Sequence, residues 1–125
     1  MASSPDLLWH EPRLALLHGW EVPDVALIRR VLSHPSNLRL DPEVVLPIRT
    51  IGHRHCITPF LRESHWVYSS FIPGGDEVDD FRAMARDIVT YATHVILFWD
   101  GKTQWLRDPL EGDDGIKRPT KVIRV

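Results

Sequence analysis

The sequence predicts an α/β fold, a small Rossmann-like three-layer sandwich with a mostly parallel sheet of four or five strands and two main helices. Two continuous apolar runs, RLALLH at 13–18 and HVILFW at 94–99, are typical of strands covered on both faces. The order strand, helix, strand, loop, strand, helix, strand, strand favours right-handed crossovers that place helices on the sheet. Because two helices are few for this design, an α+β fold with helices on one face stays open as the alternative.

The first half of the chain holds the first strand, a helix and a second strand. After the strand at 13–18, Pro23 offers a preset first helical position, and apolar residues then recur at helical spacing until Pro35 ends the helix. Residues 43–51 are rich in β-branched side chains and predict a strand. Pro47 cannot donate to a ladder, so this strand should lie at an edge or bend. Residues 52–64 lack a period and are interpreted as a connecting loop.

The second half repeats the pattern. HWVYSSFI at 65–72 is β-prone, and a helix should follow from a cap at Asp76 to about Ala92, with one apolar face. The run at 94–99 should form a central strand. Residues 104–120 hold glycines, prolines and acids and predict a polar excursion with the composition of a mobile loop. The alternating KVIRV at 121–125 is expected to return to the sheet as an edge strand.

Composition limits the partners. The 125 residues suit one domain over 1–125, with an N-terminal arm at 1–12, and the formal net charge of -2 argues against nucleic acid or an anionic membrane as a partner. The longest apolar run, 95–99, is far shorter than the ~20 residues of a membrane span. A single cysteine, Cys56, and no apolar leader favour a reducing cytoplasm.

Three polar turns are expected to share the carboxyl edge of a parallel sheet, where ligands bind in such folds. They follow the first strand, the strand before the second helix and the central strand. The candidate ligand-binding residues in these turns are His18, Gly19, Trp20, Glu21, Gly74, Gly75, Trp99, Asp100, Gly101, Lys102 and Thr103. Together they offer backbone amides, a cation, carboxylates and indole rings, which suit a small polar ligand.

Two clusters raise the question of a metal. The acids Asp76, Glu77, Asp79 and Asp80 complement the start of the second helix, and they oppose a phosphate at Gly74–Gly75. A divalent cation among these acids stays open. The residues His53, His55, Cys56 and His65 are of the types that bind zinc, but their spacing matches no zinc motif. No metal is therefore assigned.

Motifs for the common cofactors and nucleophiles are absent from the sequence. The chain has no Gly-x-Ser-x-Gly elbow, no Walker loop and no Gly-x-Gly-x-x-Gly fingerprint. We therefore expect no tightly held cofactor, and catalytic residues are left unassigned.

The segment 85–103, ARDIVTYATHVILFWDGKT, resembles a signature of the SLOG superfamily, whose Rossmann-like domains are thought to sense or process nucleotide-derived ligands. The similarity is strongest in Phe98-Trp99-Asp100-Gly101-Lys102-Thr103, which resembles the family's Trp-Asp-Gly-Lys-Ser turn. Residues 14–32 are similar to the family's opening strand, Gly19-containing turn and first helix. The resemblance implies that Lys102 neutralises an anionic group, that Asp100 accepts from a ribose or base, and that Trp99 or Trp20 stacks on a ring.

The chain departs from the family at other ligand-facing positions. Met84-Ala85 replaces an Arg-Asn pair, Thr93 replaces an acid, and Trp105-Leu106 replaces a Gly-Thr pair. These differences indicate a diverged or repurposed site.

Three functions are open from the sequence. The leading hypothesis is a nucleotide- or nucleoside-binding module. The second is a nucleoside-processing enzyme that resembles N-glycosidases or deoxyribosyltransferases and uses a carboxylate such as Glu21, Glu77 or Asp100. The third is an interaction module or homodimer formed through exposed members of the five Trp residues.

Overall fold

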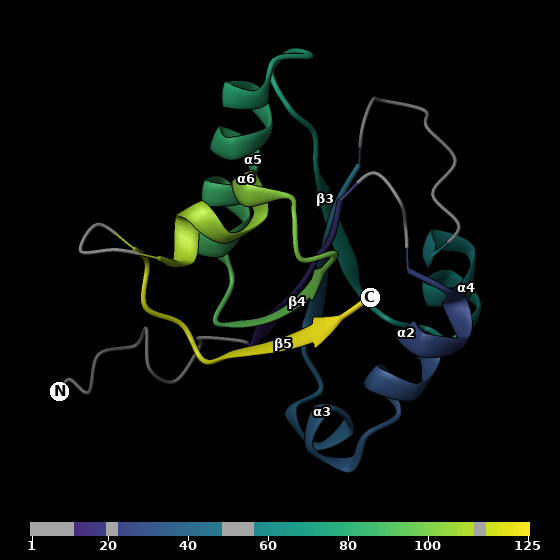
Figure 1. Cartoon of the computed structure of the whole chain (residues 1–125). Coiled ribbons are helices and arrows are strands. Elements are labelled where there is room, and N and C mark those ends of the chain that lie inside the picture. Colours follow the sequence, from purple (N-terminus) through teal and green to yellow (C-terminus); the bar gives the residue numbers. More distant parts are fainter. Residues whose placement is uncertain (1–11, 20–22, 49–56, 112–114) are drawn as a thin grey trace, which may run out of the picture.

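A five-stranded, all-parallel sheet forms the centre of the protein in a computed structural model that describes residues 12–19, 23–48, 57–111 and 115–125 (Figure 1). The strands are β1 (Arg13–Leu17), β2 (Glu43–Pro47), β3 (Tyr68–Phe71), β4 (His94–Trp99) and β5 (Thr120–Arg124). Their order across the sheet is β3-β2-β1-β4-β5. The predicted α/β class, with a small Rossmann-like sandwich, is confirmed.

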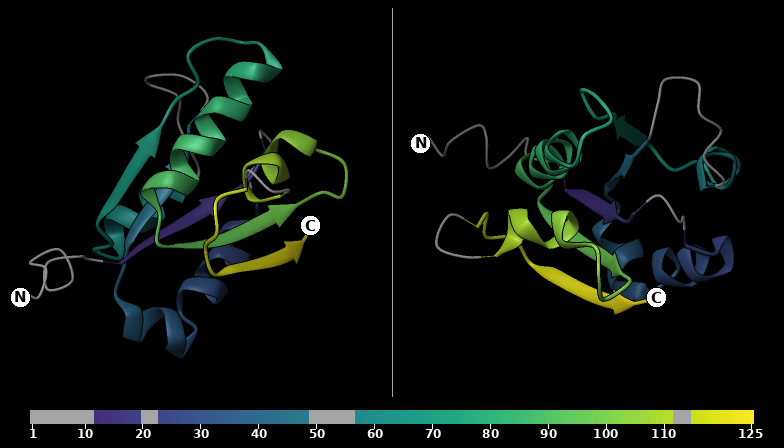
Figure 2. Two further views of the ribbon diagram at one scale, coloured as in Figure 1. Left: turned by 90° about the vertical axis from the view of Figure 1, so that its left-hand side faces the viewer. Right: turned by 45° about the horizontal axis from the view of Figure 1, so that its top comes forward.

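Helices cover both faces of this sheet (Figure 2). On one side lie α2 (Val25–Leu32) and α4 (Ile57–Glu63), with α3 (Pro35–Leu40) beside α2. On the other side lie α5 (Val78–Tyr91), α6 (Gln104–Arg107) and the 3-10 helix η1 (Asp108–Leu110). The one-sided α+β alternative is therefore wrong.

The alternation of side chains along the central strands builds two cores. In β4, Val95 and Leu97 pack toward α5, whereas Ile96 and Phe98 pack toward α2 and α4. All four are buried, because a parallel strand inside a sandwich is covered on both faces. This explains why HVILFW is continuously apolar.

The parallel pairing of β1 with β4 decides where a ligand can bind. Leu14 pairs with His94 and Leu17 with Leu97, so the two apolar runs lie side by side in the same sense, as predicted. The chain leaves β1 toward α2 on one face and leaves β4 toward α6 on the other. A parallel sheet opens a crevice at such a switch point, beyond the carboxyl ends of the strands.

The first predicted helix is shorter than expected and is followed by a second. Asp24 is the N-cap of α2, where its carboxylate accepts from Ala26 N at 2.8 Å, so Pro23 precedes the helix. Pro35 ends the pattern, as predicted, but it also begins α3, which the sequence analysis missed. Proline suits a first helical position, where no N–H is required.

Strand β2 lies inside the sheet, so the prediction that Pro47 marks an edge strand is wrong. The ladder between β1 and β2 ends at the pair Ala15–Val45, before Pro47, whereas Pro47 pairs with Phe71 of β3. A proline at the end of a strand is tolerated because no further donor is needed on that side. The predicted residues 49–51 of this strand lie outside the described part of the chain.

Part of the predicted loop at 52–64 is the helix α4. Its Ile57 and Leu61, four residues apart, are fully buried against the sheet, and Phe60 packs beside them. Pro59 falls in the first turn, where it costs no helical hydrogen bond. The prediction failed because a helix of seven residues, about two turns, carries too little periodicity to be recognised.

The predicted excursion at 104–120 begins as structure. Trp105, Leu106 and Pro109 of α6 and η1 are buried, and the first two belong to the core beneath α5. Residues 104–110 are therefore helical, with their few apolar residues facing the sheet, and the mobility of the segment stays a prediction. Strand β5 then forms the edge, as predicted.

The second predicted helix is confirmed as α5, with a different cap. Glu77, not Asp76, occupies the N-cap position, and the carboxylate of Asp80 accepts from Glu77 N at 3.0 Å. Of the described helices none is long and apolar enough to cross a bilayer, and α5 has only 14 residues.

Candidate functional site

A crevice of about 630 Å³ lies at the carboxyl edge of β1, β4 and β5, at the switch point of the sheet. Its size falls within the ~300–1,000 Å³ typical of small-molecule sites. It is lined by Gly19, Pro23, Asp24, Leu27, Phe98, Asp100, Thr103, Leu106, Arg124 and Val125. The ends of three strands and the start of α2 therefore meet in one concave surface.

The turn after β1 supplies the first wall. Gly19 follows the strand, and a Cβ added there would lie 3.8 Å from Leu106 Cδ1, which is ordinary contact. Asp24 caps α2, whose first-turn amides carry the partial positive charge of a helix N-terminus. This wall offers one carboxylate beside the start of a helix.

The turn after β4 is organised by one carboxylate. Asp100 Oδ1 accepts from Lys102 N at 2.8 Å and from Thr103 N at 2.7 Å, and Oδ2 accepts from Thr103 Oγ1 at 2.6 Å. These hydrogen bonds lower the pKa of Asp100 to about 2, and the bonds from Thr103 contribute most. Asp100 is thus an ionised acceptor at any physiological pH.

The cation of the crevice is Arg124, at the end of β5. Its guanidinium lies 5.8 Å from the centre of the Trp99 ring and occupies the space that a side chain at Gly101 would fill. Gly101 has a φ of 84°, which favours glycine. Arg107 packs on Trp99 as well, at 4.4 Å, and pairs with Glu111.

Arg124 was not among the site residues predicted from the sequence. Its signal was available in part, because KVIRV was expected to return to the sheet as an edge strand, and in a parallel sheet an arginine near the end of a strand falls on the carboxyl edge. The register pairs Trp99 with Arg124, which places both at this edge.

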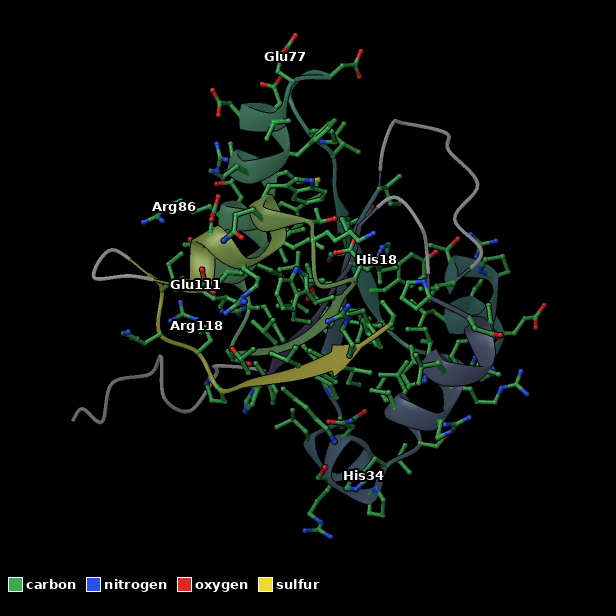
Figure 3. All side chains as sticks on the ribbon, viewed as in Figure 1. His18, His34, Glu77, Arg86, Glu111 and Arg118 are labelled. Atoms are coloured by element: carbon green, nitrogen blue, oxygen red, sulfur yellow. The ribbon has the colours of Figure 1, made fainter. Side chains whose placement is uncertain are left out.

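His18 is buried directly beneath the edge, with 1% of its surface exposed (Figure 3). Its Nδ1–H donates to Gly19 O at 2.7 Å. Burial lowers the pKa of His18 to about 4, because the interior disfavours the charged ring, and the bond to Gly19 only partly opposes this. His18 therefore supports the turn as a neutral residue and does not line the crevice.

The structure brings some of the other predicted residues together and separates others. Gly19, Asp100 and Thr103 line the crevice, and Gly101 and Trp99 touch the Arg124 side chain that lines it. Lys102 is exposed and is not part of the lining, although Asp100 holds its backbone N–H. Trp20 and Glu21 lie outside the described residues.

Gly74 and Gly75 belong to a different part of the edge, beyond β3 and two strands away from β1. They do not line the crevice. A Cβ at Gly75 would lie 2.5 Å from Asp80 Oδ2, so the carboxylate of Asp80 occupies the space above the glycine. Figure 3 shows Glu77 at the far end of α5, well away from His18.

Among the described ranges, no three or more His, Cys, Asp or Glu side chains lie close enough to share a metal ion. The acids Asp76, Glu77, Asp79 and Asp80 are included in this statement. Asp79 pairs with Arg82 at 2.6 Å, and Asp80 accepts from the backbone N–H of the N-cap residue Glu77. Of the four residues of types that bind zinc, His65 is exposed, and His53, His55 and Cys56 lie outside the described residues.

The three described Trp side chains form no exposed apolar face. Trp105 is buried, and Trp66 and Trp99 are half-buried. The other two, Trp9 and Trp20, fall outside the described ranges, so the Trp-mediated homodimer remains a prediction.

Comparison of the chain with protein-family models, curated proteins and solved structures finds no match.

Proposed function

We propose that the chain binds a small nucleotide- or nucleoside-derived ligand in the switch-point crevice. The observation that carries this proposal is the meeting of Gly19, Asp100 and Arg124 at one opening of about 630 Å³, where the chain leaves β1 and β4 in opposite directions. Ligands of α/β sheets bind at such switch points.

The lining combines the three chemistries that such a ligand needs. Arg124 offers planar N–H donors for an anionic group, and its partner Trp99 keeps the guanidinium in place. Asp24 and Asp100 offer carboxylates that accept from sugar hydroxyls or base amino groups. Leu27, Phe98 and Leu106 supply apolar surface for a ring.

The resemblance to the SLOG superfamily supports the same proposal. The residues that carry it, Gly19 and the turn 98–103, come from two distant parts of the sequence and border the same opening. In this proposal Arg124 takes the anion-binding role that the resemblance assigns to Lys102, because Arg124 belongs to the lining and Lys102 does not.

The chemistry of Asp100 favours recognition over acid catalysis. A carboxyl group with a pKa of about 2 has no proton to give near neutral pH. Its oxygens already accept three hydrogen bonds from its own turn, which stabilise the charge and weaken it as a nucleophile. The enzymatic alternative therefore gains nothing from this residue.

The test is a thermal-shift panel of nucleosides, nucleoside monophosphates and nucleoside diphosphates. Binding should raise the melting temperature and change the Trp fluorescence, since Trp99 touches the Arg124 guanidinium. Arg124→Ala should abolish the response to anionic members. Arg39→Ala is the matched control, because Arg39 is an exposed arginine outside the crevice lining.

The comparison of Arg124→Ala with Lys102→Ala assigns the cation. Loss of binding in Lys102→Ala alone would give the role to Lys102, as the sequence predicted. An unchanged melting temperature with every member of the panel would overturn the proposal.

A further inference from the structure

A second cavity lies on the α2 side of the sheet, between α2, α3 and the strands β1, β4 and β5. Its volume is about 530 Å³, within the ~300–1,000 Å³ range of small-molecule sites. It is separate from the switch-point crevice and lies toward the amino ends of the strands, where β4 begins at His94. Only Leu27 lines both cavities.

The floor and inner wall of this groove are apolar. Leu14, Ile96 and Ile123 form the floor on three neighbouring strands, and Leu27 and Val31 of α2 form the wall. Leu14 and Ile96 are almost fully buried in the core. The apolar surface open to a ligand therefore belongs chiefly to the partly exposed Leu27, Val31 and Ile123, and an aliphatic or aromatic group there would displace water.

The rim of the groove is basic. Arg30, His34, His94 and Lys121 all line it, and no Asp or Glu is part of the lining. This contrasts with the chain as a whole, which has 17 acids, 15 lysines and arginines and a net charge of -2. The lining of the groove is therefore basic because it lacks acids, whereas the chain as a whole is slightly acidic.

The basic side chains are available to a ligand. Arg30 and Lys121 are exposed, and neither takes part in an ion pair among the described residues. His34 Nδ1 accepts from Ser36 N at 3.2 Å, so the neutral ring carries its proton on Nε2 as a donor. Arg30, Lys121 and the His34 ring thus offer donors beside an apolar hollow, whereas His94 Nδ1 is bonded to Thr93 Oγ1 at 2.8 Å.

We infer that this groove binds a small anionic amphiphile, an apolar chain that ends in a carboxylate or phosphate. The apolar chain would lie against Leu27, Val31 and Ile123, and the anionic end would meet Arg30 and Lys121 at the rim. Charge complementarity selects the anion, and the absence of acids from the lining disfavours a cation. No sequence motif predicted this site, because its residues come from five separate elements.

Spacing along α2 explains how the site is built. Leu27, Arg30, Val31 and His34 follow the helical pattern i, i+3, i+4, i+7, so one stripe of α2 and its end faces the groove. The same stripe places apolar residues toward the sheet and basic residues toward solvent. In the other wall, Lys121 and Ile123 are two residues apart in β5 and therefore lie on the same face of the strand.

The experiment measures decanoate binding by calorimetry, below the concentration at which decanoate forms micelles. Decyl phosphate tests the second headgroup, decanol removes the charge and decyltrimethylammonium reverses it. We expect decanoate or decyl phosphate to bind, and the neutral and cationic probes to bind at least about tenfold more weakly. Shortening the chain should weaken binding by about fourfold for each methylene that the groove buries.

Charge reversal locates the headgroup. Arg30→Glu and Lys121→Glu should each weaken decanoate binding by about tenfold, without lowering the melting temperature of the free protein, since both side chains are exposed. Two control variants should bind decanoate as tightly as the parent protein. In Arg39→Glu the changed residue is in α3 but outside the lining of the groove, and in Arg124→Ala it lines the other cavity.

Three outcomes would overturn the inference. The first is equal binding of the anionic, neutral and cationic probes. The second is full affinity in the double variant Arg30→Glu/Lys121→Glu. The third is loss of decanoate binding in Arg124→Ala with Arg30→Glu unaffected, which would move the anion to the crevice.

Discussion

Replacing Gly101 by alanine perturbs one backbone position in the turn after β4. Gly101 has a φ of 84°, and the space that a Cβ would need is filled by the Arg124 guanidinium. The substitution therefore strains the backbone and displaces the cation of the crevice at the same time.

The expected loss of stability follows from these two effects. A non-glycine residue at positive φ costs about 1–2 kcal/mol. Moving the guanidinium away from Trp99 removes a cation–π contact worth about 0.5 kcal/mol at a half-exposed site. We expect Gly101→Ala to lower the free energy of unfolding by about 2 kcal/mol. For a chain of 125 residues this lowers the melting temperature by about 8 °C.

The assay is thermal unfolding followed by circular dichroism, with and without nucleotide. Gly74→Ala is the control, because its Cβ would lie 3.9 Å from Asp80 Oδ1 and among described glycines only Gly101 has a positive φ. The control should melt at or slightly above the temperature of the parent protein. If Gly101→Ala melts within about 2 °C of the parent, both the strain and the position of Arg124 are wrong.

Three further predictions concern stability. His18 has a pKa of about 4 in the folded protein and about 6.5 when unfolded, so the unfolded state takes up a proton first as the pH falls. The free energy of unfolding should therefore be highest above pH 6.5 and about 3 kcal/mol lower at pH 4. Urea unfolding across this pH range should show the decrease in the parent protein and not in His18→Asn. The hydrogen bonds that lower the pKa of Asp100 stabilise the fold above pH 4, and this stabilisation is lost as the pH falls toward 2. Asp100→Asn should therefore make the free energy of unfolding less dependent on pH between 4 and 2, measured by acid titration at constant temperature. An unchanged pH dependence would contradict the hydrogen bonds of this turn. Arg118→Ala should lower the free energy of unfolding by about 1–2 kcal/mol, because Arg118 donates to Ala92 O at 2.6 Å and Thr90 O at 3.1 Å at the end of α5; a denaturant midpoint equal to that of Lys117→Ala refutes this.

Strong periodicity made most of the fold predictable. The continuous apolar runs of β1 and β4 are typical of strands covered on both faces, and the apolar face of α5 extends over several turns, so the order of elements was sufficient to predict a parallel sandwich. Pro35, by contrast, both ends α2 and begins α3, and proline alone does not distinguish a break from a new start.

Short elements failed because tertiary packing decides them. Helix α4 is held by Ile57 and Leu61, and α6 by Trp105 and Leu106, and neither pair forms a pattern long enough to stand out from a loop. Pro47 was misjudged because an inner strand can end on a proline when its ladder with one neighbour has already ended.

The candidate site was predictable only in part for a related reason. The turns after β1 and β4 were placed at one opening by the rule for parallel sheets, which needs only the sense of the strands. Arg124 required the register of β5, and the basic groove required the packing of α2 and α3 on the sheet. Neither is encoded in a local pattern.

Because β1 lies in the middle of the sheet, its two neighbouring strands leave the ribosome at different times. Leu14 pairs with Val44 on one side and with His94 on the other, so its two neighbours are made at very different times. A nascent chain that has emerged only through α5 holds β1–β3 but exposes one side of β1 as an open edge. Such chains need β4 to cover this edge, and deletions that remove about the final quarter of the chain, from β4 on, should aggregate through that edge rather than persist as a folded fragment.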